Sequence, residues 1–115
     1  MGRGREGARR AVPRARVIRR RARFGDVIGR QLDLFARERA GDIEETEKRL
    51  AAYNAADRDE AEERYGDFVD SVDLVKDFLE EIRDTYSQTL DEPTRDVYER
   101  QFERELAKRW PRFAL

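Results

Sequence analysis

The chain has 115 residues, with 25 basic and 26 acidic side chains and neither histidine nor cysteine. Disulfides, thiol chemistry, imidazole bases and zinc sites built from Cys or His are therefore excluded. Because 44% of the residues are charged and 38% are apolar, the apolar side chains must lie on narrow faces. This composition favours a thin all-α protein over one with a thick core.

The N-terminal segment is strongly basic. Residues 1–24 hold ten arginines and one glutamate, a balance of +9, whereas residues 25–115 hold 15 basic and 25 acidic side chains, a balance of −10. Residues 1–13 contain three glycines and a proline without periodic apolar residues. We expect them to be a disordered tail and residues 14–115 to form a single helical domain.

The first predicted helix covers about residues 15–56. In its first half, apolar side chains occupy a face about 160° wide at ~100° per residue, as in a helix with more than one neighbour. These side chains are Phe24, Val27, Ile28, Leu32, Leu34 and Phe35. The pattern predicts a kink near Gly41, with Gly41 as a C-cap and Asp42 and Glu45 starting the next segment.

The second predicted helix covers residues 58–90, with Asp57 as its N-cap. Its apolar residues follow a nearly strict heptad spacing, which is typical of a long packed helix: they are Ala61, Tyr65, Phe68, Val72, Val75, Leu79, Ile82, Tyr86 and Leu90. Leu74 and Phe78 widen the apolar face in the second half of this helix.

A shorter helix is predicted over residues 92–110, with Asp91 as its N-cap, Pro93 in its first turn and Pro111 after its end. The two long helices span about 50 Å each at 1.5 Å per residue, so they pair as an antiparallel hairpin. The last helix is about half as long and packs on the base of the hairpin, where the apolar faces are wide. In "RWPRFAL", Trp110 and Phe113 are expected to close the base against Phe24 and Tyr86, or to dock into a partner.

The tip of the hairpin is predicted to have narrow apolar stripes and no third helix. Because helical stability comes mainly from burying a continuous face, we expect a homodimer or a protein partner at the tip. The candidate contact residues are Ile43, Leu50, Tyr53, Tyr65, Phe68, Val69 and Val72.

The arginine-rich stretch allows three interpretations. Its side chains could bind nucleic-acid phosphates without base specificity, or the acidic second helix of this chain or of a neighbour. A third interpretation is that some of residues 1–16 precede the natural start, at Val12 or Val17. The candidate nucleic-acid contacts are Arg9, Arg10, Arg14, Arg16, Arg19, Arg20, Arg21 and Arg23.

The sequence contains no phosphate-binding loop, dinucleotide fingerprint or nucleophile with a plausible base. Its carboxylate clusters lie mostly off the apolar seam, as on a solvated face, and no apolar run is long enough to cross a membrane. We therefore expect no enzymatic activity, no cofactor, metal, small-molecule ligand or membrane contact, and a cytoplasmic location. The predicted function is that of an adaptor or regulator acting through protein contacts, with nucleic-acid association as the alternative.

Overall fold

The described part of the protein is helical. The computed structural model describes residues 23–115, which form α2 (Gly25–Glu38), α3 (Ala40–Ala55), α4 (Ala61–Ser87), α5 (Glu92–Arg109) and a short 3₁₀ helix, η1 (Pro111–Phe113), without a strand. The predicted all-α class is therefore confirmed. The predicted disordered tail over 1–13 and the helix start near residue 15 lie outside the described residues.

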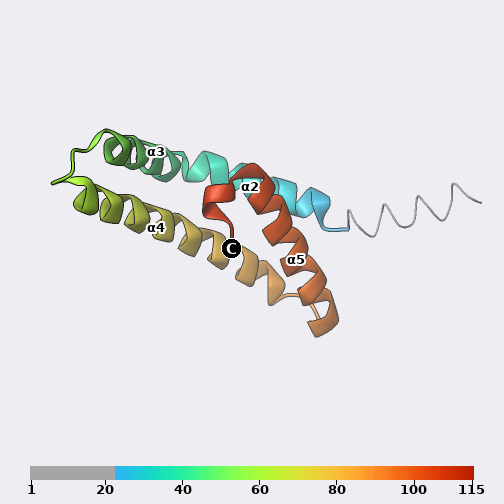
Figure 1. The fold of residues 1–115 in the computed structure, drawn as a ribbon. Coiled ribbons are helices and arrows are strands. Elements are labelled where there is room, and N and C mark those ends of the chain that lie inside the picture. Colours follow the sequence, from blue (N-terminus) through green and yellow to red (C-terminus); the bar gives the residue numbers. More distant parts are fainter. Residues whose placement is uncertain (1–22) are drawn as a thin grey trace, which may run out of the picture.

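The helices form a hairpin with α5 inserted at its base (Figure 1). One arm consists of α2 and α3, and the other arm is α4, which runs in the opposite direction. At the tip α3 packs directly against α4, whereas α2 and α4 separate toward the base and α5 packs on both. The hairpin is thus two helices thick at the tip and three helices thick at the base.

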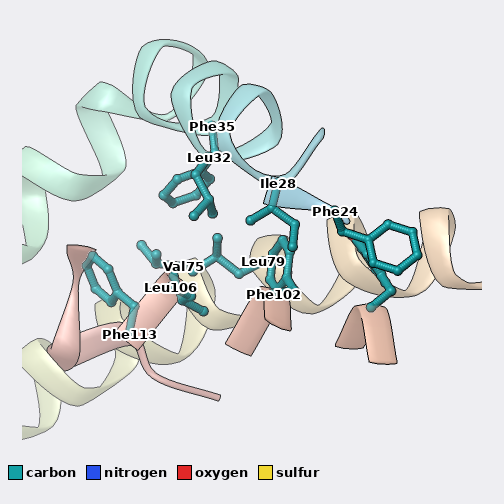
Figure 2. Close-up of a cluster of buried hydrophobic side chains, with 10 residues drawn as sticks. Phe24, Ile28, Leu32, Phe35, Val75, Leu79, Phe102, Leu106 and Phe113 are labelled. Carbon is teal, nitrogen blue, oxygen red and sulfur yellow. The ribbon is translucent and has the colours of Figure 1, made fainter. Parts of the chain in front are cut away.

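The hydrophobic core lies at the base, where α2, α4 and α5 meet (Figure 2). Its buried side chains are Phe24, Ile28, Leu32, Phe35, Val75, Leu79, Tyr98, Phe102, Leu106 and Phe113. Full burial of such a side chain contributes about 1.5–3 kcal/mol. Since none of these ten residues comes from α3, the tip is held by other contacts.

Two ion pairs attach α5 to both arms of the hairpin. Arg83 of α4 donates to Glu103 of α5 over 3.1 Å, and Arg109 of α5 donates to Asp33 of α2 over 2.7 Å. Pairs at the surface contribute about 0.2–1 kcal/mol each. They therefore orient α5, while apolar burial supplies most of its stability.

A kink at Arg39 separates α2 from α3. Arg39 has φ −113° and ψ 24°, yet its N–H still donates to the Phe35 carbonyl over 2.8 Å and its carbonyl still accepts from Ile43 over 3.0 Å. The kink lies two residues before Gly41, near which the sequence places it. The predicted caps are wrong, because no described glycine has a positive φ and Asp42 lies inside α3.

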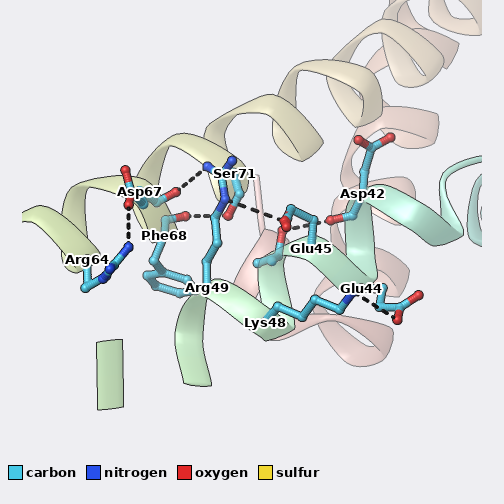
Figure 3. Close-up of polar contacts among 10 residues, drawn as sticks. Asp42, Glu44, Glu45, Lys48, Arg49, Arg64, Asp67, Phe68 and Ser71 are labelled. Atoms are coloured by element: carbon cyan, nitrogen blue, oxygen red, sulfur yellow. Dashed lines mark hydrogen bonds and ion pairs between the residues drawn. The ribbon is translucent and has the colours of Figure 1, made fainter. Parts of the chain in front are cut away.

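Small polar side chains line the contact between α3 and α4 (Figure 3). Thr46 and Ser71 are buried, and each hydroxyl donates to a carbonyl about one turn back in its own helix, over 3.0 and 2.7 Å. Arg49 of α3 donates to the Asp67 carbonyl of α4 over 2.8 Å. The Arg49 bond therefore links α3 to α4, whereas the bonds of Thr46 and Ser71 satisfy buried hydroxyls within their own helices.

The turn at the tip is organised by Asp57. Its carboxylate accepts from the N–H groups of Asp59 and Glu60, both over 3.1 Å. The predicted role of Asp57 is thus partly right: it holds the turn, but α4 begins at Ala61 rather than at residue 58. The difference arises because a short hydrogen-bonded turn precedes the first turn of the helix.

The start of α5 follows the predicted capping pattern. The carboxylate of Asp91 accepts from the Thr94 N–H over 3.2 Å, and Pro93 lies in the first turn. Hydrogen bonds from Thr94 lower the pKa of the Asp91 carboxyl below its ordinary value. The cap therefore fixes where the chain turns back from α4 into α5.

The aromatic C-terminus lies near the middle of the hairpin. Because α5 runs back from the base for 18 residues, about 27 Å, its end meets Phe35, whose ring centroid lies 5.4 Å from that of Trp110. Phe113 is buried in the core. The predicted contact of these residues with Phe24 and Tyr86 is wrong, since both of those rings pack against Tyr98 instead.

Two leucines of α4 provide a matched test of the core. Leu79→Ala removes a fully buried side chain and is expected to lower the free energy of unfolding by about 2–5 kcal/mol. Leu74→Ala, at a position 48% exposed, is expected to lower it by less than ~0.5 kcal/mol. Urea denaturation of both variants measures the difference, and equal losses would contradict the position of the core.

Candidate protein-binding groove

An open groove runs between α2 and α4, on the side of the hairpin away from α5. It has a volume of about 510 Å³, and its lining includes Gln31, Leu34 and Glu38 of α2 and Phe78, Ile82 and Tyr86 of α4. The groove exists because α5 holds the two helices apart and covers one side of the gap. The other side is left without a helix.

Apolar side chains reach solvent along this groove. Leu34 is 46% exposed, and Phe78 and Ile82 are half-buried beside it. Leu74, one turn before Phe78, continues the same face of α4 and is also exposed. Of these residues, Leu34, Phe78 and Ile82 line the groove itself, and apolar surface left open in this way is typical of a site that contacts another segment.

Arg39 bridges the tip end of the groove. Its guanidinium carbon lies 3.8 Å from the centroid of the Phe78 ring, a cation–π contact between the kink and α4. The same guanidinium lies 3.9 Å from the carboxylate of Asp42. The kink residue thus limits the length of the groove and links the two arms.

A hydrogen bond joins Gln31 of the groove lining to Tyr98 of α5. The Tyr98 hydroxyl donates to Gln31 Oε1 over 2.9 Å, and Tyr98 has no exposed surface. Burial raises the pKa of Tyr98 to about 12, and the bond to Gln31 offsets this only partly. Tyr98 is therefore neutral at physiological pH and fixes the position of Gln31.

Three charged side chains line the groove, two of them acidic: Glu38, Glu81 and Arg39. Glu38 and Glu81 belong to its lining, and Glu81 borders the solvent-facing side of α4. Along α4, seven carboxylates form no ion pair with another described residue: Glu62, Glu63, Asp70, Asp73, Asp77, Glu80 and Glu81. They recur at helical spacing and create a negative field that attracts basic segments.

The predicted nucleic-acid contacts fall almost entirely outside the described residues. Arg9, Arg10, Arg14, Arg16, Arg19, Arg20 and Arg21 are not described. Arg23 is described, and its guanidinium carbon lies 5.3 Å from the Phe24 ring centroid. Its position beside α2 shows that the basic segment joins the fold at the base of the hairpin.

The predicted self-association residues lie mostly inside the hairpin. Ile43 and Val72 pack against the core, and Leu50, Tyr53, Phe68 and Val69 are half-buried. Tyr65 is 51% exposed, although its ring lies 5.2 Å from that of Tyr53 between centroids. Self-association at the tip stays a prediction, but six of its seven residues are already partly covered by their own chain.

The groove is not predicted from the sequence, although the width of the apolar faces indicates that one neighbouring helix cannot cover them. The sequence pattern predicts that the wide apolar faces around Leu34 and Phe78 contact the last helix. In the structure, Leu32 and Leu79 are buried in one cluster with the core residues of α5, while Leu34 and Leu74 remain exposed. An apolar face wider than one neighbouring helix can cover is the sign that would have pointed to an open surface.

Within residues 23–115, no cluster of acidic side chains is arranged to hold a metal ion. None of the described helices has the length and apolar character needed to cross a membrane. The polar groups next to the apolar lining include Gln31, Thr85 and Thr89. Gln31 accepts a hydrogen bond from Tyr98, and the Thr89 hydroxyl donates to the Tyr86 carbonyl.

The environment of Tyr98 predicts a pH dependence. Because its pKa is about 12 in the folded protein and about 10 in an unfolded chain, the folded state holds the proton more tightly. The stability from this group is complete below pH ~10 and is lost as the pH rises toward 12. An absorbance titration of tyrosine ionisation should show a late component that Tyr98→Phe removes. A late component that persists in the variant would contradict the assignment.

Comparison of the chain with protein-family models, with curated proteins and with solved structures gives no significant match. Function is therefore inferred from the groove and the charges of the chain itself.

Proposed function

We propose that the protein is a non-enzymatic helical adaptor whose groove between α2 and α4 binds a segment of a partner protein. The observation that carries this proposal is the open apolar lining at Leu34, Phe78 and Ile82, which two helices already hold in place. A preformed groove avoids much of the ordering cost that binding imposes on flexible surfaces.

The chemistry of the groove favours an amphipathic segment with basic flanks. A helix can lay an apolar face on Leu34 and Phe78, as in other helix-in-groove complexes. Glu38 and Glu81 then face arginine or lysine side chains of that segment. The other carboxylates on α4 add long-range attraction, which raises the association rate and favours basic partners over acidic ones.

A labelled synthetic peptide tests this proposal. The peptide carries leucines at helical i, i+4 and i+7 positions between arginines, and a matched peptide replaces every arginine with glutamate. We expect fluorescence anisotropy to show binding of the basic peptide alone. Leu34→Glu should weaken it at least ~10-fold, which corresponds to ~1.4 kcal/mol.

Val97→Glu is the matched control, because Val97 lies on α5 outside the groove and is exposed to the same degree, 47% against 46% for Leu34. Equal affinities of the two variants would contradict the proposed site. Analytical ultracentrifugation checks a different occupant. A dimer that Leu34→Glu dissociates would place a second copy, rather than another protein, in the groove.

A further inference from the structure

The groove has a candidate occupant within the same chain. We propose that residues 9–22 occupy it in cis, with Val17 and Ile18 on the apolar lining and the arginines beside Glu38, Glu81 and other carboxylates of α4. The segment would then be an intramolecular competitor of the partner. This inference rests on the groove assigned in the proposed function, but not on the existence of a partner.

Chain length allows the contact. The segment joins the described structure at Arg23, beside the first turn of α2. From the start of α2 to Leu34 the distance along the helix is about 14 Å at 1.5 Å per residue. Val17 lies six residues before Arg23 and reaches up to ~20 Å at 3.3 Å per residue. Val12 reaches up to ~36 Å, beyond the tip end of the groove.

Residues 9–22 match the groove in apolar side chains and in charge. Its large apolar side chains are Val12, Val17 and Ile18, which are the type needed against Leu34 and Phe78. Residues 9–22 also hold seven arginines and no acid. Of the groove lining, Glu38 and Glu81 are acidic, and further carboxylates of α4 outside the groove have no ion-pair partner among residues 23–115, so the segment and this side of the hairpin carry opposite charge.

Because the segment is covalently attached, it can occupy the groove for most of the time even if its intrinsic affinity is low. A short linker gives a tethered segment an effective concentration in the millimolar range. A partner present at micromolar concentration must therefore displace the segment before it binds. Modification or sequestration of the arginines would release the groove, so the segment would regulate the adaptor.

A spin label tests the contact in the full chain. Because the chain contains no cysteine, Ala15→Cys creates a unique attachment point between Arg14 and Arg16. We expect paramagnetic broadening of the NMR amide signals of Leu34, Phe78 and Ile82. The signal of Val97, on α5 outside the groove, should keep its intensity.

Two variants separate docking from mere proximity. Val17→Asp with Ile18→Asp, in the labelled chain, should restore the groove signals to the intensity of a diamagnetic control. Val17→Leu with Ile18→Leu should leave them broadened. Broadening confined to residues around Arg23, or identical in both variants, would overturn the proposal and leave the arginines free for other anionic partners, including nucleic acid.

A mixed sample separates the cis contact from a second copy. Isotope-labelled chain without the spin label is mixed with spin-labelled chain without the isotope. The cis proposal predicts undiminished groove signals in this mixture. Broadening of Leu34 and Phe78 would place the segment of one copy on the groove of another and overturn it.

The affinity for the basic peptide tests the cis contact and the partner site separately. If both hold, Val17→Asp with Ile18→Asp binds the basic peptide at least ~10-fold more tightly than the unaltered chain does. Equal tight binding by both chains supports the groove as a partner site and overturns the cis contact. Failure of both chains to bind the peptide, with groove broadening intact, overturns the partner proposal alone.

Discussion

The insertion of α5 between α2 and α4 is the contact on which the rest of the structure depends. Tyr98, Phe102 and Leu106 of α5 are fully buried, and they give the two arms a shared core that neither could form alone. Only 38% of the residues are apolar. The apolar side chains of α5 cover one side of the gap between α2 and α4, and no further helix within residues 23–115 covers the other side. The separation of α2 from α4 therefore follows from the way the core is built.

The same separation explains where a binding surface can form. Because α5 occupies one side of the gap, the other side leaves Leu34 exposed beside Phe78 and Ile82, between α2 and α4. The solvent-facing side of α4 also carries seven carboxylates that form no ion pair with a described basic residue. The proposed function follows from this pairing of an apolar groove with nearby carboxylates, since an apolar segment with basic flanks would complement both, and the N-terminal segment of this chain has that composition.

The features that depend on local spacing could be predicted from the sequence. The cap at Asp91 and the long heptad pattern place α5 and α4 within a few residues, because capping and periodicity act over one or two turns. Features that depend on contacts between helices could not. The contact of Arg39 with the Phe78 ring of α4 joins residues that are far apart in the sequence, and the exposure of Leu34 depends on the side from which α5 enters. A single sequence contains no signal for that side.

The position of Tyr98 tests the central claim most directly, since the claim is that α5 lies between the two arms. The Tyr98 ring lies 5.4 Å from that of Phe24 at the start of α2 and 4.7 Å from that of Tyr86 on α4, between centroids. Nuclear Overhauser spectra of the full chain should show contacts of Tyr98 with both rings. Contacts with one arm alone would mean that α5 packs outside the hairpin, and the groove assigned to the opposite side would not exist.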